Sequence, residues 1–136
     1  MATTTATVTI TSADLTGDAL ALSTTATLTK AQSANTGLEQ TTGVARKYYA
    51  TAQTAALLLD ATDYATATQA TKVYVKNLST TKSETVTLQI NNASTTIEIG
   101  KLYGGDWAFF PWDGANDIEI DTSATAMTIE YFVIFE

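Results

Sequence analysis

The side chains that most enzymes use for nucleophilic or acid–base chemistry are largely missing here, because the chain has neither histidine nor cysteine. Their absence excludes Ser-His-Asp triads, histidine general bases, thiolate nucleophiles and zinc held by histidine or cysteine. No serine lies in a nucleophile-elbow pattern, and the pair Gly104–Gly105 opens no helix of the kind that binds phosphate. The sequence therefore predicts a protein that is not an enzyme.

The reactive groups that remain are four clustered carboxylates: Asp113, Asp117, Glu119 and Asp121. Closely spaced carboxylates in a loop can bind Ca²⁺ through their oxygen atoms. The segment does not have the twelve-residue spacing of an EF-hand, however, and its last three acids alternate with Ile118 and Ile120. Nothing indicates the cleft that a glycosidase pair of carboxylates would need. The alternation favours a solvated strand face, with a metal site as the alternative.

Five aromatic residues form the second cluster: Tyr103, Trp107, Phe109, Phe110 and Trp112. In an extended chain, Trp107 and Phe109 would share one face, and Phe110 and Trp112 the other. Such rings can fill a core, form a subunit interface or stack on sugars. The two-sided pattern favours a strand packed on both faces. We therefore expect core packing first, an oligomer interface second and a ligand platform last.

Both clusters lie among short segments in which apolar and polar residues alternate. The alternation is clearest in Glu84–Ile90, Thr95–Ile99 and Asp117–Asp121. A period of two gives a strand one buried and one wet face, and several such strands separated by turn residues predict an antiparallel β-sandwich or barrel. The closing strand, Met127–Glu136, ends apolar on both faces, which predicts a central strand or one covered by a partner chain. We expect nine or ten strands in all and little helix.

The first half of the chain is less regular. Its expected strands are Ala6–Thr11, Leu20–Leu28, Val44–Thr51 and Ala55–Asp60. Val8 and Ile10 should face inward, residues 1–5 should form a flexible arm, and the polar stretch 30–43 should form a long loop. Asn91–Asn92 lies where a tight hairpin needs positive φ, which asparagine tolerates.

Composition limits the class of protein further. The chain has 136 residues, fits one domain (1–136), and carries a net charge of −7 with only 15% charged residues. Without a basic stripe, binding to nucleic acid or to an anionic membrane is not expected. The N-terminus lacks the features of a signal peptide, and no apolar run is long enough to span a bilayer. We expect a soluble protein made in a cytoplasm.

Three segments carry a resemblance to a known group of proteins: Lys72-Val-Tyr-Val-Lys-Asn77, Leu102-Tyr-Gly-Gly-Asp-Trp-Ala-Phe-Phe-Pro-Trp112 and Ile129-Glu-Tyr-Phe-Val-Ile-Phe-Glu136. Together they resemble small virion structural proteins of tailed bacteriophages, in particular those of cyanophages and marine phages. The resemblance covers the second half of the chain, whereas the first half shares only a Thr- and Ala-rich character. These are packing motifs, so the resemblance transfers no catalytic residue and no cofactor.

The resemblance implies a jelly-roll-like β-sandwich that assembles on the virion. It favours a capsid decoration (cement) protein on the capsid surface, a homotrimer that contacts the major capsid protein, over a tail or connector component. Contacts with neighbours are expected from the loop 30–43 and from Ala2–Thr5. Outside this group, the leading alternative is a carbohydrate-binding β-sandwich that serves host adhesion, which requires Trp107 or Trp112 to be exposed.

Overall fold

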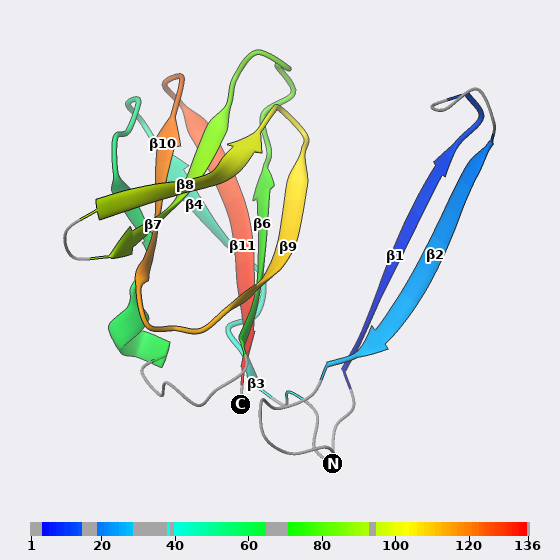
Figure 1. Cartoon of the computed structure of the whole chain (residues 1–136). Coiled ribbons are helices and arrows are strands. Elements are labelled where there is room, and N and C mark those ends of the chain that lie inside the picture. The colour runs from blue at the N-terminus through cyan, green and yellow to red at the C-terminus, as the bar shows by residue number, and fades with distance from the viewer. Residues whose placement is uncertain are drawn as a thin grey trace.

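The computed structural model describes residues 4–14, 19–28, 38, 40–64, 71–92 and 95–135 (Figure 1). In these ranges the chain forms eleven strands and one short 3-10 helix, η1 (Ala61–Tyr64). The strands are β1 (Thr5–Ser12), β2 (Leu20–Thr27), β3 (Gln40–Thr41), β4 (Ala45–Tyr49), β5 (Ala56–Leu59), β6 (Thr71–Asn77), β7 (Val86–Asn92), β8 (Thr95–Leu102), β9 (Trp107–Trp112), β10 (Asp117–Thr122) and β11 (Met127–Phe135). All of their pairings are antiparallel, which confirms the predicted all-β class.

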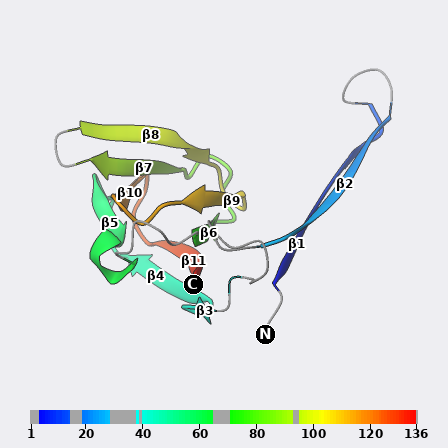
Figure 2. The same cartoon turned by 60° about the horizontal axis from the view of Figure 1, so that its bottom comes forward.

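Nine of the strands form two sheets that face each other as the layers of a sandwich (Figure 2). The first, here called the β7 sheet, has the order β5-β10-β7-β8. The second, the β6 sheet, has the order β3-β11-β6-β9, and β4 pairs with β11 beside β3. Strand β11 is therefore bordered on both edges, as predicted for the closing strand.

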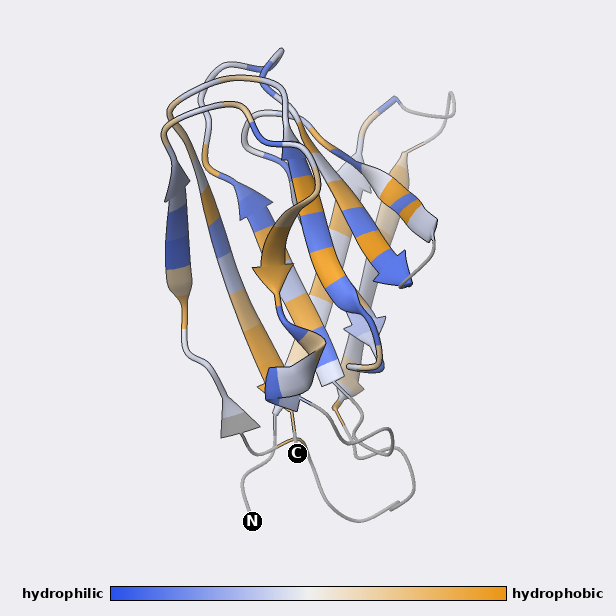
Figure 3. Cartoon of the chain, turned by 90° about the vertical axis from the view of Figure 1, so that its left-hand side faces the viewer, coloured by the Kyte–Doolittle hydropathy of each residue, from blue (hydrophilic) through white to orange (hydrophobic). Residues whose placement is uncertain are grey.

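The core lies between the two sheets and follows from the period of two. Its most buried side chains, each at most 2% exposed, include Val73, Val75, Ile129 and Val133 from the β6 sheet and Val86, Leu88, Ile118 and Ile120 from the β7 sheet. Figure 3 shows the corresponding alternation of hydrophobic and hydrophilic bands along the strands. Because successive side chains of a strand point to opposite faces, each strand leaves a second set of residues on the outside of the sandwich.

Hydrogen bonds tie together the loop after β6 and the β8–β9 turn. Asn77 is fully buried, and its Nδ2 donates to the carbonyl oxygens of Glu84 (2.8 Å) and Leu102 (3.2 Å). Its Oδ1 accepts from the amide of Ser79 at 3.0 Å. In the β8–β9 turn, a Cβ placed on Gly104 would lie 2.2 Å from the carbonyl oxygen of Thr81, so only glycine fits.

Strands β1 and β2 form a separate two-stranded sheet, here called the arm. It projects beyond the sandwich (Figure 1). The expectation that Val8 and Ile10 face into the core is wrong, since Val8 is only half-buried and Ile10 is 46% exposed. The alternating pattern gave the correct secondary structure, but a strand's own sequence does not say which other element covers its apolar face.

The remaining expectations concern a turn and two loop or terminal segments, parts of which lie outside the described residues. Asn91 and Asn92 do not adopt positive φ; they continue β7 and pair with Thr96 and Thr95, so the predicted turn at these residues is wrong. The connection between the strands, residues 93–94, lies outside the described residues. Residues 1–3 of the flexible segment predicted at residues 1–5 also lie outside the described residues, as does most of the loop predicted at 30–43. Within that predicted loop, residues 40–41 form β3.

Candidate interaction surface

The outer side of the β6 sheet carries aromatic side chains where water-facing polar residues are usual. Tyr74 on β6 lies opposite Phe132 on β11 and opposite Phe109 on β9, so that the three rings form one row across the sheet. The rings of Tyr74 and Phe132 stack with centroids 4.9 Å apart, and Trp107 lies 6.3 Å from Tyr74. With Tyr48 on β4, these residues are here called the aromatic face.

Much of this face is open. Tyr48 is 62% exposed and Trp107 is 53% exposed, while the three rings of the central row are half-buried. Burial, with a smaller contribution from the negative charge of Glu130, raises the pKa of the Tyr74 phenol. Contiguous exposed aromatic surface on a folded domain is typical of a binding site for protein or for a flat ligand.

Cationic side chains border the aromatic face. Arg46 on β4 forms an ion pair with Glu130 on β11, with Nη2 and Oε2 2.8 Å apart. Lys72 and Lys76 occupy the outward positions of β6 on either side of Tyr74. Three of the chain's seven cationic residues thus lie on one sheet face of a protein whose net charge is −7. This surface therefore favours a neutral or acidic partner.

The structure separates the five aromatic residues that the sequence singled out. Trp107 and Phe109 point outward, while Trp112 is 4% exposed and its Nε1 donates to the carbonyl oxygen of Asn116 at 2.9 Å. Phe110 packs at the edge of the core, and Tyr103 lies in the β8–β9 turn with 51% exposure.

Sequence reasoning missed Tyr48, Tyr74 and Phe132, because they come from strands distant in sequence. The available signal was an aromatic residue at an outward position of a strand whose alternate residues are buried. Tyr74, between Val73 and Val75, fits that description.

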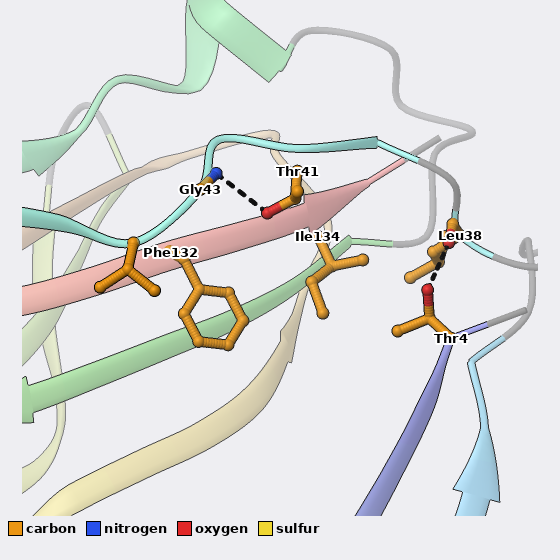
Figure 4. Close-up of a pocket in the computed structure, with 7 residues that line it drawn as sticks. Thr4, Leu38, Thr41, Gly43, Phe132 and Ile134 are labelled. Carbon is orange, nitrogen blue, oxygen red and sulfur yellow. Dashed lines mark hydrogen bonds between the residues drawn. The ribbon is translucent and has the colours of Figure 1, made fainter. Parts of the chain in front are cut away.

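An apolar groove of about 290 Å³ continues the aromatic face toward the base of the arm (Figure 4). Its lining residues are Thr4, Leu38, Thr41, Gly43, Val44, Phe132 and Ile134. The hydroxyl of Thr4 donates to the carbonyl oxygen of Leu38 at 2.9 Å, and the amide of Leu38 donates to the carbonyl oxygen of Leu28 at 3.1 Å. These bonds connect the base of the arm to the groove. Phe132 belongs to both the groove and the aromatic face, so the two form one surface.

The arm has two chemically different faces, set by its register. On one face, three of the four cross-strand pairs join threonine with threonine or serine, the fourth being Thr11–Ala21, and the hydroxyls of Thr7 and Thr25 lie 2.7 Å apart. The other face is apolar and consists mainly of the cross-strand pairs Ala6–Ala26, Val8–Thr24 and Ile10–Leu22, followed by Leu20 opposite Ser12. Ile10 and Leu22 are 46% and 47% exposed, so the apolar face is uncovered in a single copy.

The acidic segment of β10 is not the solvated face that was expected. Glu119 is only 8% exposed, since Asn91 on the neighbouring strand donates to its Oε1 at 2.8 Å. Asp121 accepts from Gln89 and from the amide of Ala55. These carboxylates lie on the outward side of β10, where cross-strand amides pack over them. In the part of the chain that the structure describes, no group of three or more acidic residues is placed to hold a metal ion.

Comparison with known proteins adds no family to this description. No protein-family model matches the chain, and no curated protein matches it by sequence. Among the residues that the structure describes, no helix is long and apolar enough to cross a membrane. The described surface can stack on rings, bury apolar groups and attract negative charge, which are the properties of a binding surface.

Proposed function

We propose that this chain is a non-enzymatic structural protein of a tailed-phage virion that binds the outside of the capsid as a decoration protein. The observation that carries the proposal is that the folded chain leaves two apolar surfaces uncovered, the aromatic face and the apolar face of the arm. A protein with two such surfaces is suited to assembly with other protein chains. The resemblance of the segments Lys72–Asn77, Leu102–Trp112 and Ile129–Glu136 to phage virion proteins supplies the virion as the place of assembly.

The order of the strands supports a jelly roll for this protein. From β4 to β11 the chain has eight strands, four in each sheet, and β4, β5 and β6 alternate between the sheets. Eight strands in two antiparallel sheets are the architecture of jelly rolls, which are frequent among capsid proteins. The proposal therefore includes a jelly-roll sandwich with an additional arm before its first strand.

The mechanism is mass action. A protein that binds the assembled shell but not its free subunits stabilises the shell by its binding free energy at every site. The partner is the major capsid protein, and a homotrimer makes three weak contacts act together. The protein is made in the host cytoplasm and acts on the capsid surface.

The deciding experiment is quantitative mass spectrometry of this chain against the major capsid protein in purified particles of its source virus. A simple fraction of the capsid-protein copy number supports decoration. A handful of copies supports the alternative role in the tail or connector, and none at all overturns the virion assignment. For a decoration protein, particles assembled without it should release their genome at a lower temperature.

One observation favours a second function, a host-adhesion module that binds carbohydrate. Trp107 is 53% exposed beside Tyr74, and an indole on a rigid sheet can stack on a sugar ring. This function predicts that a polysaccharide from the host surface shifts tryptophan fluorescence, and that Trp107→Ala removes binding. Tyr103→Ala is the matched control, since Tyr103 is equally exposed but lies in a turn. Unchanged fluorescence argues against adhesion.

A further inference from the structure

We infer that the arm of one copy of this chain packs, through its apolar face, on the aromatic face of a second copy. The inference rests on the proposed function, for which it identifies the symmetric contact between subunits. It concerns the free protein, however, and is tested without virus particles.

The arm is too small to bury its own apolar side chains. A two-stranded ribbon is marginally stable in water unless a third element covers one face. Ile10 and Leu22 face each other across the arm and are 46% and 47% exposed. Covering them with apolar surface would stabilise the arm by removing both side chains from water.

The aromatic face of a second copy matches the arm in length and in apolar character. Both strands of the arm have eight residues, and the strands β6 and β11 beneath the aromatic face have seven and nine. Two sheets pack well when the side chains of their facing surfaces are apolar and interdigitate. A second copy is also the one occupant that covers both uncovered surfaces, because each copy then gives an arm and receives one.

Charge favours the same arrangement. The strands β1 and β2 contain no charged residue, whereas the whole chain carries −7. The paired strands of the arm can therefore approach another copy of an acidic protein without charge repulsion of their own. The surface that receives it carries Arg46, Lys72 and Lys76 against the single acid Glu130, so it attracts the remainder of an acidic partner.

In a dimer, the area that the exchange covers is close to that of the smallest specific interfaces. A ribbon of two eight-residue strands is ~27 Å long and ~10 Å wide, which gives a footprint of about 270 Å². In a dimer that exchanges arms, both contacts belong to one interface, so about 540 Å² of each copy is covered there, against roughly 600 Å² per partner at the low end of specific interfaces. Each interface of a larger ring contains one such contact and covers about 270 Å² per partner. The apolar groove at the base of the arm adjoins this contact.

The orientation of the arm indicates a second copy rather than the arm's own sandwich. The arm stands away from the β6 sheet of its own chain (Figure 2). Its apolar side chains are exposed there, and so is Trp107 on the aromatic face. Exchange of arms around a closed ring covers both surfaces in every copy, so no further copy can add, and contact with the capsid falls to the rest of the ring's surface.

Cross-linking between single-cysteine variants of the full chain tests the contact, and the absence of native cysteine makes the result specific. Ile10→Cys and Tyr74→Cys chains with tags of different size are mixed and treated with a short bismaleimide. We expect a mixed cross-linked dimer, several-fold more abundant than that from Thr9→Cys mixed with Tyr74→Cys. Thr9 is the control because it neighbours Ile10 but lies on the polar face of the arm. Equal yields, or a product made only of Ile10→Cys chains, overturn the inference.

The mass of the protein in solution, measured by light scattering, provides the second test. We expect a dimer or larger closed ring for the native chain and a monomer for the double variant Ile10→Lys with Leu22→Lys. The matched variant Thr9→Lys with Ser23→Lys puts the same charges on the polar face and should keep the native mass. Circular dichroism is used to check that both variants are folded. A native chain that is monomeric at its highest soluble concentration overturns the inference. A ring whose protein is absent from particles overturns only the capsid function.

Discussion

The rings of Tyr74 and Phe132 stack at 4.9 Å, with an angle of 19° between their planes, on the side of the β6 sheet that faces away from the core. The next residue of β11, Val133, points the other way and is fully buried. Two neighbouring residues of one strand thus have different environments: Val133 lies in the core and Phe132 lies on the open outer surface.

This division predicts different effects for matched substitutions. Val133→Ala leaves a cavity between the sheets and should lower the free energy of unfolding by about 2 kcal/mol. Phe132→Ala removes a larger side chain but loses mainly its stacking on Tyr74, about 1 kcal/mol. Urea denaturation of the two variants measures the difference. A larger loss for Phe132→Ala, under conditions where the chain is monomeric, would contradict the assignment of the faces.

Gly104 should be irreplaceable in the β8–β9 turn. A Cβ at this position would lie 2.2 Å from a backbone oxygen, which cannot move without disturbing the loop after β6. We expect Gly104→Ala to lower the free energy of unfolding by about 3 kcal/mol, at the upper end of overpacking effects. Gly100→Ala is the control, because Gly100 has open space around it and ordinary backbone angles. Similar thermal midpoints for the two variants would show that the turn is not packed as described.

Asn77 should act as a structural amide in the same region. Its side chain satisfies two carbonyl groups and one amide from three different residues, and it is fully buried. Asn77→Ala leaves these groups without partners, and we expect a loss of about 3 kcal/mol in chemical denaturation. Asn92→Ala changes an exposed residue at the end of β7 and should have little effect. A loss below 1 kcal/mol for Asn77→Ala would mean that water replaces the amide.

Tyr49 should make the protein sensitive to alkaline pH. Burial, with a smaller contribution from Tyr131, raises the pKa of Tyr49 to about 12, and its hydroxyl has no hydrogen-bond partner among the described residues. The folded state therefore holds this proton more tightly than the unfolded state, whose tyrosine has a pKa near 10. The stabilising contribution is complete below about pH 10 and is lost as the pH rises toward 12, by on the order of 1 to 2 kcal/mol.

Denaturation curves at pH 8 to 12 measure this dependence on pH. Tyr49→Phe should reduce the fall in stability above pH 10, and at neutral pH it should be neutral or slightly stabilising, since it removes a polar group without a partner. Tyr48→Phe is the control, because Tyr48 is 62% exposed. If Tyr48→Phe reduces the alkaline loss as much as Tyr49→Phe, the buried hydroxyl is not its origin.

The fold class could be predicted from the sequence because the period of two is a local property. Val86, Leu88, Ile118 and Ile120 occupy the alternate positions that a buried strand face requires, and all four are in the core. The central place of β11 also followed from its own residues, which are apolar on both faces. In each of these segments the residues that determine the structure lie within a few positions of one another.

The aromatic face and the arm could not be predicted in the same way. Tyr74, Phe109 and Phe132 form one row only after β6 has paired with two strands that lie far away in sequence. The pattern of Val8 and Ile10 correctly indicated an apolar strand face, but no described part of the chain's own sandwich covers Ile10, which is 46% exposed. Glu119 became buried because Asn91 and Gln89 from β7 lie beside it, which no spacing within β10 indicates.

Because β3 has only two residues, the connection between the arm and the sandwich should be weak under a pulling force. Between the arm and β4, the described pairing with β11 consists of the two residues of β3 and two hydrogen bonds between Thr42 and Val133, whereas five register pairs join β4 to β11. Tension applied through the arm should therefore detach β3 first and stop at β4. The arm would act as a compliant tether that gains length under load while the sandwich stays folded.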